Sequence, residues 1–98
     1  MTATATLQPD PHAVAHLAPA LADLKALRVP GGQEYFLAAL LVEVCRSSDS
    51  HMLTHFEGQG LGYALALHNT QVLDQYECEA LRQVFKDAAN RVRPDLTE

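Results

Sequence analysis

Four segments of the chain carry apolar residues at helical spacing, and stretches rich in Gly, Pro or polar residues separate them. In the first segment, residues 11–28, leucines recur every three or four positions until the sequence VPGG interrupts the pattern. Asp10 and Pro11 suit its start, as N-cap and first helical residue. Pro19 lies inside the pattern, so we expect either a kink or two short helices that meet there.

The second segment, residues 33–48, is apolar on nearly every side. Before its polar end, only Gln33, Glu34 and Glu43 interrupt a run of large apolar residues. A helix that is apolar all round is usually buried all round. We therefore expect a central helix of the fold, or one that another subunit covers.

The third segment, residues 51–68, is predicted to be a helix. Helical spacing would place six residues on its core face: Leu53, Phe56, Gly60, Tyr63, Ala64 and Leu67. Residues 60–67 also alternate in size as a strand would, which leaves a strand as the alternative. Ala and Leu favour helices, and no β-branched residue lies between Phe56 and Asn69, so we prefer the helix.

The last segment begins with a helix-capping signature. Asp74 followed three residues later by Glu77 is typical of a capping box, and Pro94 closes a predicted helix over 74–92. We expect its core face to hold Tyr76, Ala80, Leu81, Val84, Phe85, Ala88 and Val92.

Together these patterns predict an all-α fold, a compact bundle of four to five helices. Its C-terminal part is an antiparallel helical hairpin of about 51–68 and 74–92. Residues 11–93 form a single domain, preceded by a disordered arm over 1–10 and followed by a tail over 94–98.

Length and charge narrow the class of partner. The chain has 98 residues, 48% of them hydrophobic, and a net charge of −5. A domain this small buries a modest core and often gains stability from a second copy, so we expect a homodimer with a further protein partner. The acidic balance disfavours nucleic acid as a direct ligand, because that requires clustered Lys and Arg.

The chain also lacks the signals of export and membrane insertion. Its longest uninterrupted apolar run, YFLAALLV, is far shorter than the roughly 20 residues of a membrane span. The first residues show no signal-peptide pattern. Cys45 and Cys78 are too few for a disulfide framework and are expected to be reduced thiols. We therefore expect a cytoplasmic protein that does not interact with membranes.

Three glycines in the sequence EGQGLG raise the question of a phosphate-binding loop. The spacing differs from the dinucleotide fingerprint, no strand precedes it, and the Lys of a phosphate loop is missing. Gly58 and Gly62 are instead four residues apart on the predicted helix. This spacing allows another backbone to approach closely.

The histidines form two pairs with i, i+4 spacing, and each pair can present two imidazoles on one helix face. The candidate metal ligands are His12, His16, His51 and His55. A zinc-protease signature would need Glu directly after the first His of a pair, which neither pair has. The alternative is that all four are ordinary surface or interface residues, and we predict no cofactor.

A single stripe of the third helix, opposite its core face, is the predicted interaction surface. It comprises His51, His55, Gly58 and Gly62. We refer to these four residues as the α-stripe. Because glycine has no side chain, a partner's backbone could approach this surface closely at Gly58 and Gly62.

No convergent nucleophile, acid and base are visible, so we predict that the protein is not an enzyme. A helix-turn-helix over 61–82 would present Asp74, Glu77 and Glu79 to phosphates, which disfavours DNA binding. We predict a small acidic protein-interaction module, an inhibitor or regulator that binds a host protein complex. In kind, though in no motif, the chain resembles accessory proteins of phages and mobile elements, such as anti-CRISPR inhibitors. The alternatives are a metal- or ligand-binding helical bundle that uses the histidine pairs, and a small dimeric transcriptional regulator.

Overall fold

The computed structural model describes residues 11–96, with side chains from residue 13 onward. Within this range the chain forms four α-helices and one short 3-10 turn, and no strand. They are α2 (Pro11–Leu27), α3 (Gln33–Arg46), α4 (Ser50–Asn69), α5 (Gln75–Val92) and η1 (Arg93–Asp95). The predicted all-helical class is confirmed. The predicted arm over 1–10, with its N-cap Asp10, lies outside the described residues, as do the last two residues of the tail.

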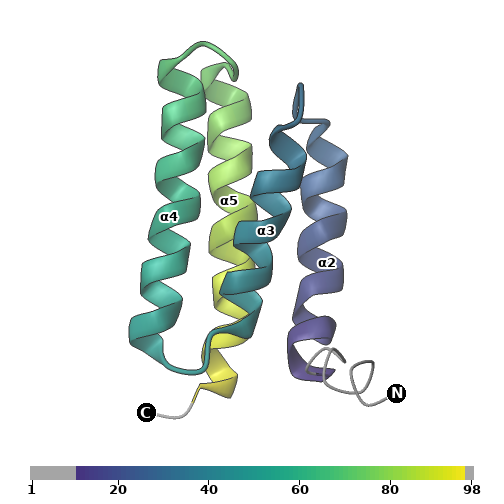
Figure 1. The fold of residues 1–98 in the computed structure, drawn as a ribbon, viewed down its shortest axis with the longest axis vertical. Helices are drawn as coiled ribbons and strands as arrows, with labels where there is room; N and C mark the ends of the chain where they lie inside the picture. The colour runs from purple at the N-terminus through teal and green to yellow at the C-terminus, as the bar shows by residue number, and fades with distance from the viewer. Residues whose placement is uncertain (1–10, 97–98) are drawn as a thin grey trace, which may run out of the picture.

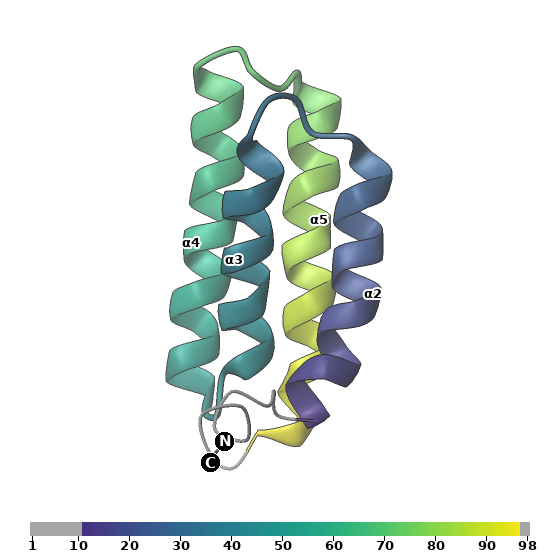
Figure 2. The ribbon, with the colours of Figure 1, turned by 45° about the vertical axis from the view of Figure 1, so that its right-hand side comes forward.

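The four helices form an up-and-down bundle. Figures 1 and 2 show successive helices running in opposite directions, with α2 and α4 on opposite sides and α3 and α5 between them. Each of α3 and α5 packs against both α2 and α4. The loops 28–32 and 70–74 lie together at one end of the bundle (Figure 1).

The helix ends follow the sequence closely. α2 continues through Pro19 as one helix, and it ends where Arg28 adopts a left-handed conformation with φ 54°. The Asp49 side chain accepts a hydrogen bond from the Met52 backbone N–H at 2.8 Å and so caps α4. Because α4 is helical throughout residues 60–67, the strand alternative is excluded.

The capping box predicted for the last helix is present. Asp74 Oδ1 accepts from the Glu77 backbone N–H at 2.7 Å, and Glu77 Oε1 accepts from the Asp74 backbone N–H at 2.9 Å. Two otherwise unsatisfied donors are thereby paired, which fixes the start of α5 at Gln75.

The core lies between all four helices. Its largest fully buried side chains are Phe85, Leu24, Leu37, Leu41, Leu53, Leu81 and Val44. Phe85 of α5 packs against the backbone of Gly60 in α4, where a Cβ atom would overlap the phenyl ring. A glycine is therefore required where α4 packs against Phe85 of α5.

Two predictions of burial need correction. Within the single chain α3 is not buried all round, because Tyr35 and Phe36 expose 76% and 55% of their surface, and cover by another subunit stays a prediction. A helix at the corner of a four-helix bundle contacts its neighbours with only part of its circumference. The prediction that Tyr76 faces the core is wrong: Tyr76 is 83% exposed, and the buried series of α5 begins at Cys78, about 200° further around the helix.

Candidate functional site

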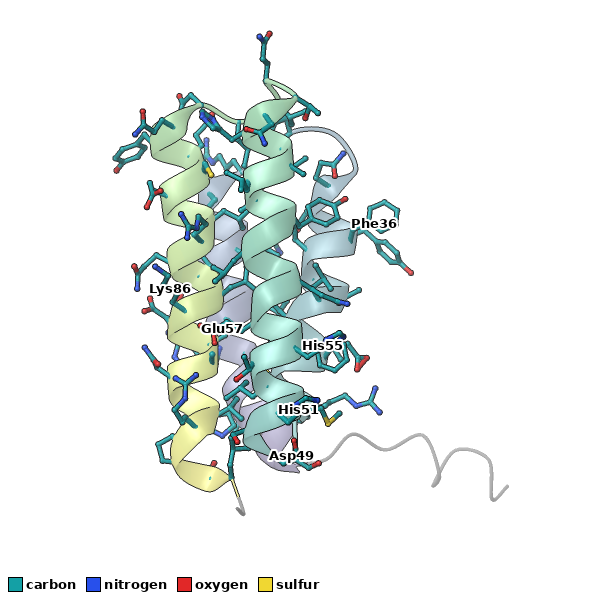
Figure 3. All side chains as sticks on the ribbon, turned by 90° about the vertical axis from the view of Figure 1, so that its left-hand side faces the viewer. Phe36, Asp49, His51, His55, Glu57 and Lys86 are labelled. Atoms are coloured by element: carbon teal, nitrogen blue, oxygen red, sulfur yellow. The ribbon has the colours of Figure 1, made fainter. Side chains whose placement is uncertain are left out.

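The α-stripe lies on the outer side of α4, and all four of its residues are exposed. Figure 3 shows His51 and His55 along the side of the bundle where α3 lies beside α4, with Phe36 projecting from α3 on the same side. The structure therefore places the predicted surface on the same side of the bundle as Phe36, an aromatic residue of a helix that was expected to be buried.

The two glycines of the α-stripe make no close contact within the chain. A Cβ atom at Gly58 or at Gly62 would meet no heavy atom within 4 Å, in contrast to Gly60. The close packing that glycine permits is thus used by Gly60 inside the fold. Gly58 and Gly62 leave the backbone of α4 open to solvent, and any close approach there has to come from another molecule.

His55 is oriented by its own helix. The Gln59 side-chain amide donates to His55 Nε2 at 3.2 Å, in the tautomer with the ring proton on Nδ1. The ring also meets Phe56 edge-on, with the centroids 5.0 Å apart. The imidazole of His55 is therefore held at the surface by two neighbours.

Among the described side chains, His16 does not meet His51 and His55. His16 Nε2 on α2 donates to Asp95 Oδ2 at 2.7 Å, while His51 and His55 lie on α4, across the bundle (Figure 1). The side chain of His12 lies outside the described residues. No group of three or more His, Cys, Asp or Glu side chains suited to a metal ion occurs in the part of the chain that the structure describes.

Tyr35 and Phe36 form an exposed aromatic pair on α3. Their ring centroids are 5.6 Å apart and the ring planes are nearly perpendicular, at 83°. We call these two residues the aromatic pair. Sequence reasoning missed it because the apolar pattern of residues 33–48 shows which residues are apolar but not which side of the helix lacks a neighbour.

Few charges surround the aromatic pair and the α-stripe. Glu57 is the only charged residue within α4, and Arg93 Nη2 lies 3.3 Å from its Oε1. Glu43 and Arg46 of α3 pair with each other at 3.6 Å. α5, by comparison, carries six charged residues in 18 positions. Glu34, beside Tyr35, is the remaining charged residue of α3. α3 and α4 together therefore hold fewer charged residues than α5, four in 34 positions, although their net charge is −2 and that of α5 is zero.

A cavity of about 500 Å³ opens at the end of the bundle that holds the loops 28–32 and 70–74. It lies between the C-terminal end of α2 and the first turns of α5. Its lining residues are Ala26, Leu27, Val29, Leu73, Asp74, Tyr76, Glu77 and Ala80. None of them belongs to the α-stripe or the aromatic pair, so this is a separate feature.

Both cysteines are buried free thiols. Burial raises the pKa of the Cys45 thiol from 9.0 to about 11, and the Arg91 guanidinium acts in the opposite direction. Cys78 Sγ donates to the Ala64 carbonyl at 3.5 Å. Because the thiolate is the nucleophilic form, a buried thiol with a raised pKa is suited to packing rather than to chemistry.

None of the helices within residues 11–96 combines the length and the apolar character needed to cross a membrane. Comparison of the chain with protein families, with curated proteins and with solved structures gives no match.

Proposed function

We propose that the protein is a non-enzymatic protein-interaction module, an inhibitor or regulator that docks onto a host protein complex. The docking surface is the aromatic pair on α3 together with the neighbouring α-stripe on α4. The observation that carries this proposal is the exposure of Tyr35 and Phe36, at 76% and 55%, on the outer side of α3.

Docking at an exposed aromatic pair has a clear energetic basis. Tyr and Phe can each bury roughly 150–250 Å² in a contact, and apolar burial contributes about 25 cal/mol per Å². Aromatic side chains are also enriched in the centres of protein interfaces, where few residues carry most of the binding energy. Tyr35 and Phe36 are therefore the expected anchors of the contact.

The charge distribution supports a protein partner. Interface centres are depleted in charged residues, whereas a nucleic-acid surface needs clustered Lys and Arg. Within α4, Glu57 is the only Asp, Glu, Lys or Arg, and it is paired with Arg93 of η1.

The α-stripe gives this surface a second element. The exposed backbone at Gly58 and Gly62 leaves room for a partner's side chains or backbone. His51 and His55 lie beside it as hydrogen-bonding groups. We propose that the aromatic pair anchors the partner and that the α-stripe accommodates its closest approach.

The other functions are less well supported by the geometry. A metal-binding bundle would need ligands beyond His51 and His55, and His16 is held by Asp95 on another helix. A small dimeric transcriptional regulator, the homodimer and the cytoplasmic location all stay predictions.

Affinity capture tests the docking surface. Tagged wild-type protein and a Tyr35→Ser/Phe36→Ser variant are compared in host lysate, with Tyr76→Ser as a matched control. Tyr76 has a similar exposure of 83% but lies on α5, away from the proposed surface. We expect quantitative mass spectrometry to show a specific partner whose recovery falls about tenfold or more with the double variant, as for interface anchors. The Tyr76→Ser protein should recover it fully.

The substituted side chains are exposed, so both variants should keep the wild-type circular dichroism spectrum and melting temperature. The proposal fails if the folded double variant captures the same proteins as the wild type, or if the Tyr76→Ser control loses them equally.

A further inference from the structure

The cavity between α2 and α5 is lined by apolar residues and by two carboxylates. Ala26, Leu27 and Val29 come from the end of α2 and the loop after it, Leu73 from the loop before α5, and Ala80 from α5. A volume of about 500 Å³ is within the range of roughly 300–1,000 Å³ that small-molecule sites occupy. We infer that this cavity binds a small organic cation, an ammonium or guanidinium group joined to a short apolar body.

The sign of the ligand's charge follows from the two carboxylates. Asp74 and Glu77 line the cavity, and no basic residue does. Each uses one oxygen in the capping box, Oδ1 and Oε1 respectively. Neither carboxylate takes part in an ion pair with any residue in the described part of the chain. Their remaining oxygens are therefore available to a cationic ligand.

An anion is disfavoured at the same place. The N-terminus of a helix attracts anions through its free backbone N–H groups. At α5 the Asp74 carboxylate already accepts from the Glu77 N–H, and an incoming anion would face two carboxylates. A neutral apolar ligand would contact the apolar lining but would bring no counter-charge to those carboxylates.

Tyr76 adds an aromatic wall. Its side chain lines the cavity although 83% of its surface is exposed to solvent. A cation over the face of a tyrosine ring gains roughly 0.5–1 kcal/mol at an exposed site. A ligand whose apolar body lies against the apolar lining residues, with its cationic group near Tyr76 and the carboxylates, would contact all three kinds of lining residue.

An NMR titration with matched probes tests this assignment. The probes are n-butylammonium, butan-1-ol and butyrate, which share the alkyl chain and differ in charge. We expect n-butylammonium to shift the resonances of Leu27, Tyr76 and Ala80 with an affinity near the millimolar range. Butan-1-ol should bind about fivefold more weakly, since each exposed ion pair adds only about 0.2–1 kcal/mol. Butyrate should produce no saturable shift at these residues.

The charge can be removed without removing the helix cap. Asn is as good an N-cap as Asp, and Gln can replace Glu in a capping box. In an Asp74→Asn/Glu77→Gln variant, n-butylammonium should bind no more tightly than butan-1-ol, and butan-1-ol should bind as in the wild type. Glu79→Gln, an exposed charge on α5 that does not line the cavity, is the control and should keep the preference.

Salt provides a second measurement on the unmodified protein, because ionic strength screens exposed charges. The preference for n-butylammonium over butan-1-ol should shrink as salt rises from about 20 mM to about 500 mM. The inference is overturned if the alcohol binds as tightly as the amine, if the double variant keeps the preference, or if no probe shifts the lining residues. The Tyr35→Ser/Phe36→Ser protein should bind the amine normally, so this result is independent of the proposed docking function.

Discussion

At the scale of single residues, burial changes the chemistry of Cys45 most clearly. The side chain lies in the core at 4% exposure, and its pKa is raised to about 11. The thiol therefore stays protonated in the native protein at neutral pH. In this environment Cys45 acts as a small apolar residue of the core and needs no chemical role.

The raised pKa of Cys45 predicts a loss of stability in alkaline solution. The unfolded thiol, with a pKa of 9.0, loses its proton before the native thiol, with a pKa of about 11. Between these values the native state binds more protons, so the free energy of unfolding falls as pH rises, by up to about 1.4 kcal/mol per pH unit. Below pH 8 this contribution is fully present and constant.

Urea unfolding of the wild type and of Cys45→Ala between pH 7 and pH 11 measures the effect. The variant lacks the titrating thiol but keeps Cys78 and every tyrosine and lysine. The stability advantage of the wild type over the variant should shrink above pH 9. An advantage that stays constant up to pH 11 would show that burial does not shift this thiol.

At the scale of one helix, the three glycines of α4 differ in what they do. Gly60 faces Phe85 and has no room for a side chain, whereas Gly58 and Gly62 are exposed with open space above them. Within a single chain the two outer glycines only lower helix propensity, by about 1 kcal/mol each relative to alanine.

Alanine substitutions separate these roles. Gly58→Ala and Gly62→Ala should each raise the free energy of unfolding by about 0.5–1 kcal/mol, because they stabilise an exposed helix interior. Gly60→Ala should lower it by about 1–3 kcal/mol, because the methyl group overpacks against Phe85. Thermal unfolding of the three variants provides the comparison. If Gly60→Ala were as stable as the other two variants, the tight contact between Gly60 and Phe85 would be contradicted.

Elements were predictable from the sequence where the signal is local. The capping box of Asp74 and Glu77, the end of α2 near VPGG and the core face of α4 all depend on neighbouring residues. Burial of α3 was not predictable in the same way. Which of its apolar residues remain exposed depends on the positions of three other helices, and that information is not local to residues 33–46.

The same difference between local signals and tertiary packing decides which parts of the candidate sites could be predicted. Spacing placed His51, His55, Gly58 and Gly62 on one exposed side of α4, because residues on the same helix have a fixed relation. The aromatic pair beside them, and the cavity between α2 and α5, arise from tertiary packing. Neither has a signature in the order of residues.

At the scale of the whole molecule, the charges and the apolar surface are separated. α5 carries six charged residues, three of each sign, while α3 and α4 carry four between them and present two exposed aromatic rings. We propose that this sparsely charged side is the surface on which another protein docks, because few hydrated charges would be lost there.

Site-specific photo-crosslinking tests that central claim most directly. A benzoylphenylalanine is placed at position 36 in one protein and at position 76 in another, and both are irradiated in host lysate. Both positions hold exposed aromatic side chains, so the probe should disturb the fold equally little. We predict a discrete crosslinked partner from position 36 and none from position 76. Crosslinks of equal yield from both positions, or from position 76 alone, would contradict docking through α3 and α4.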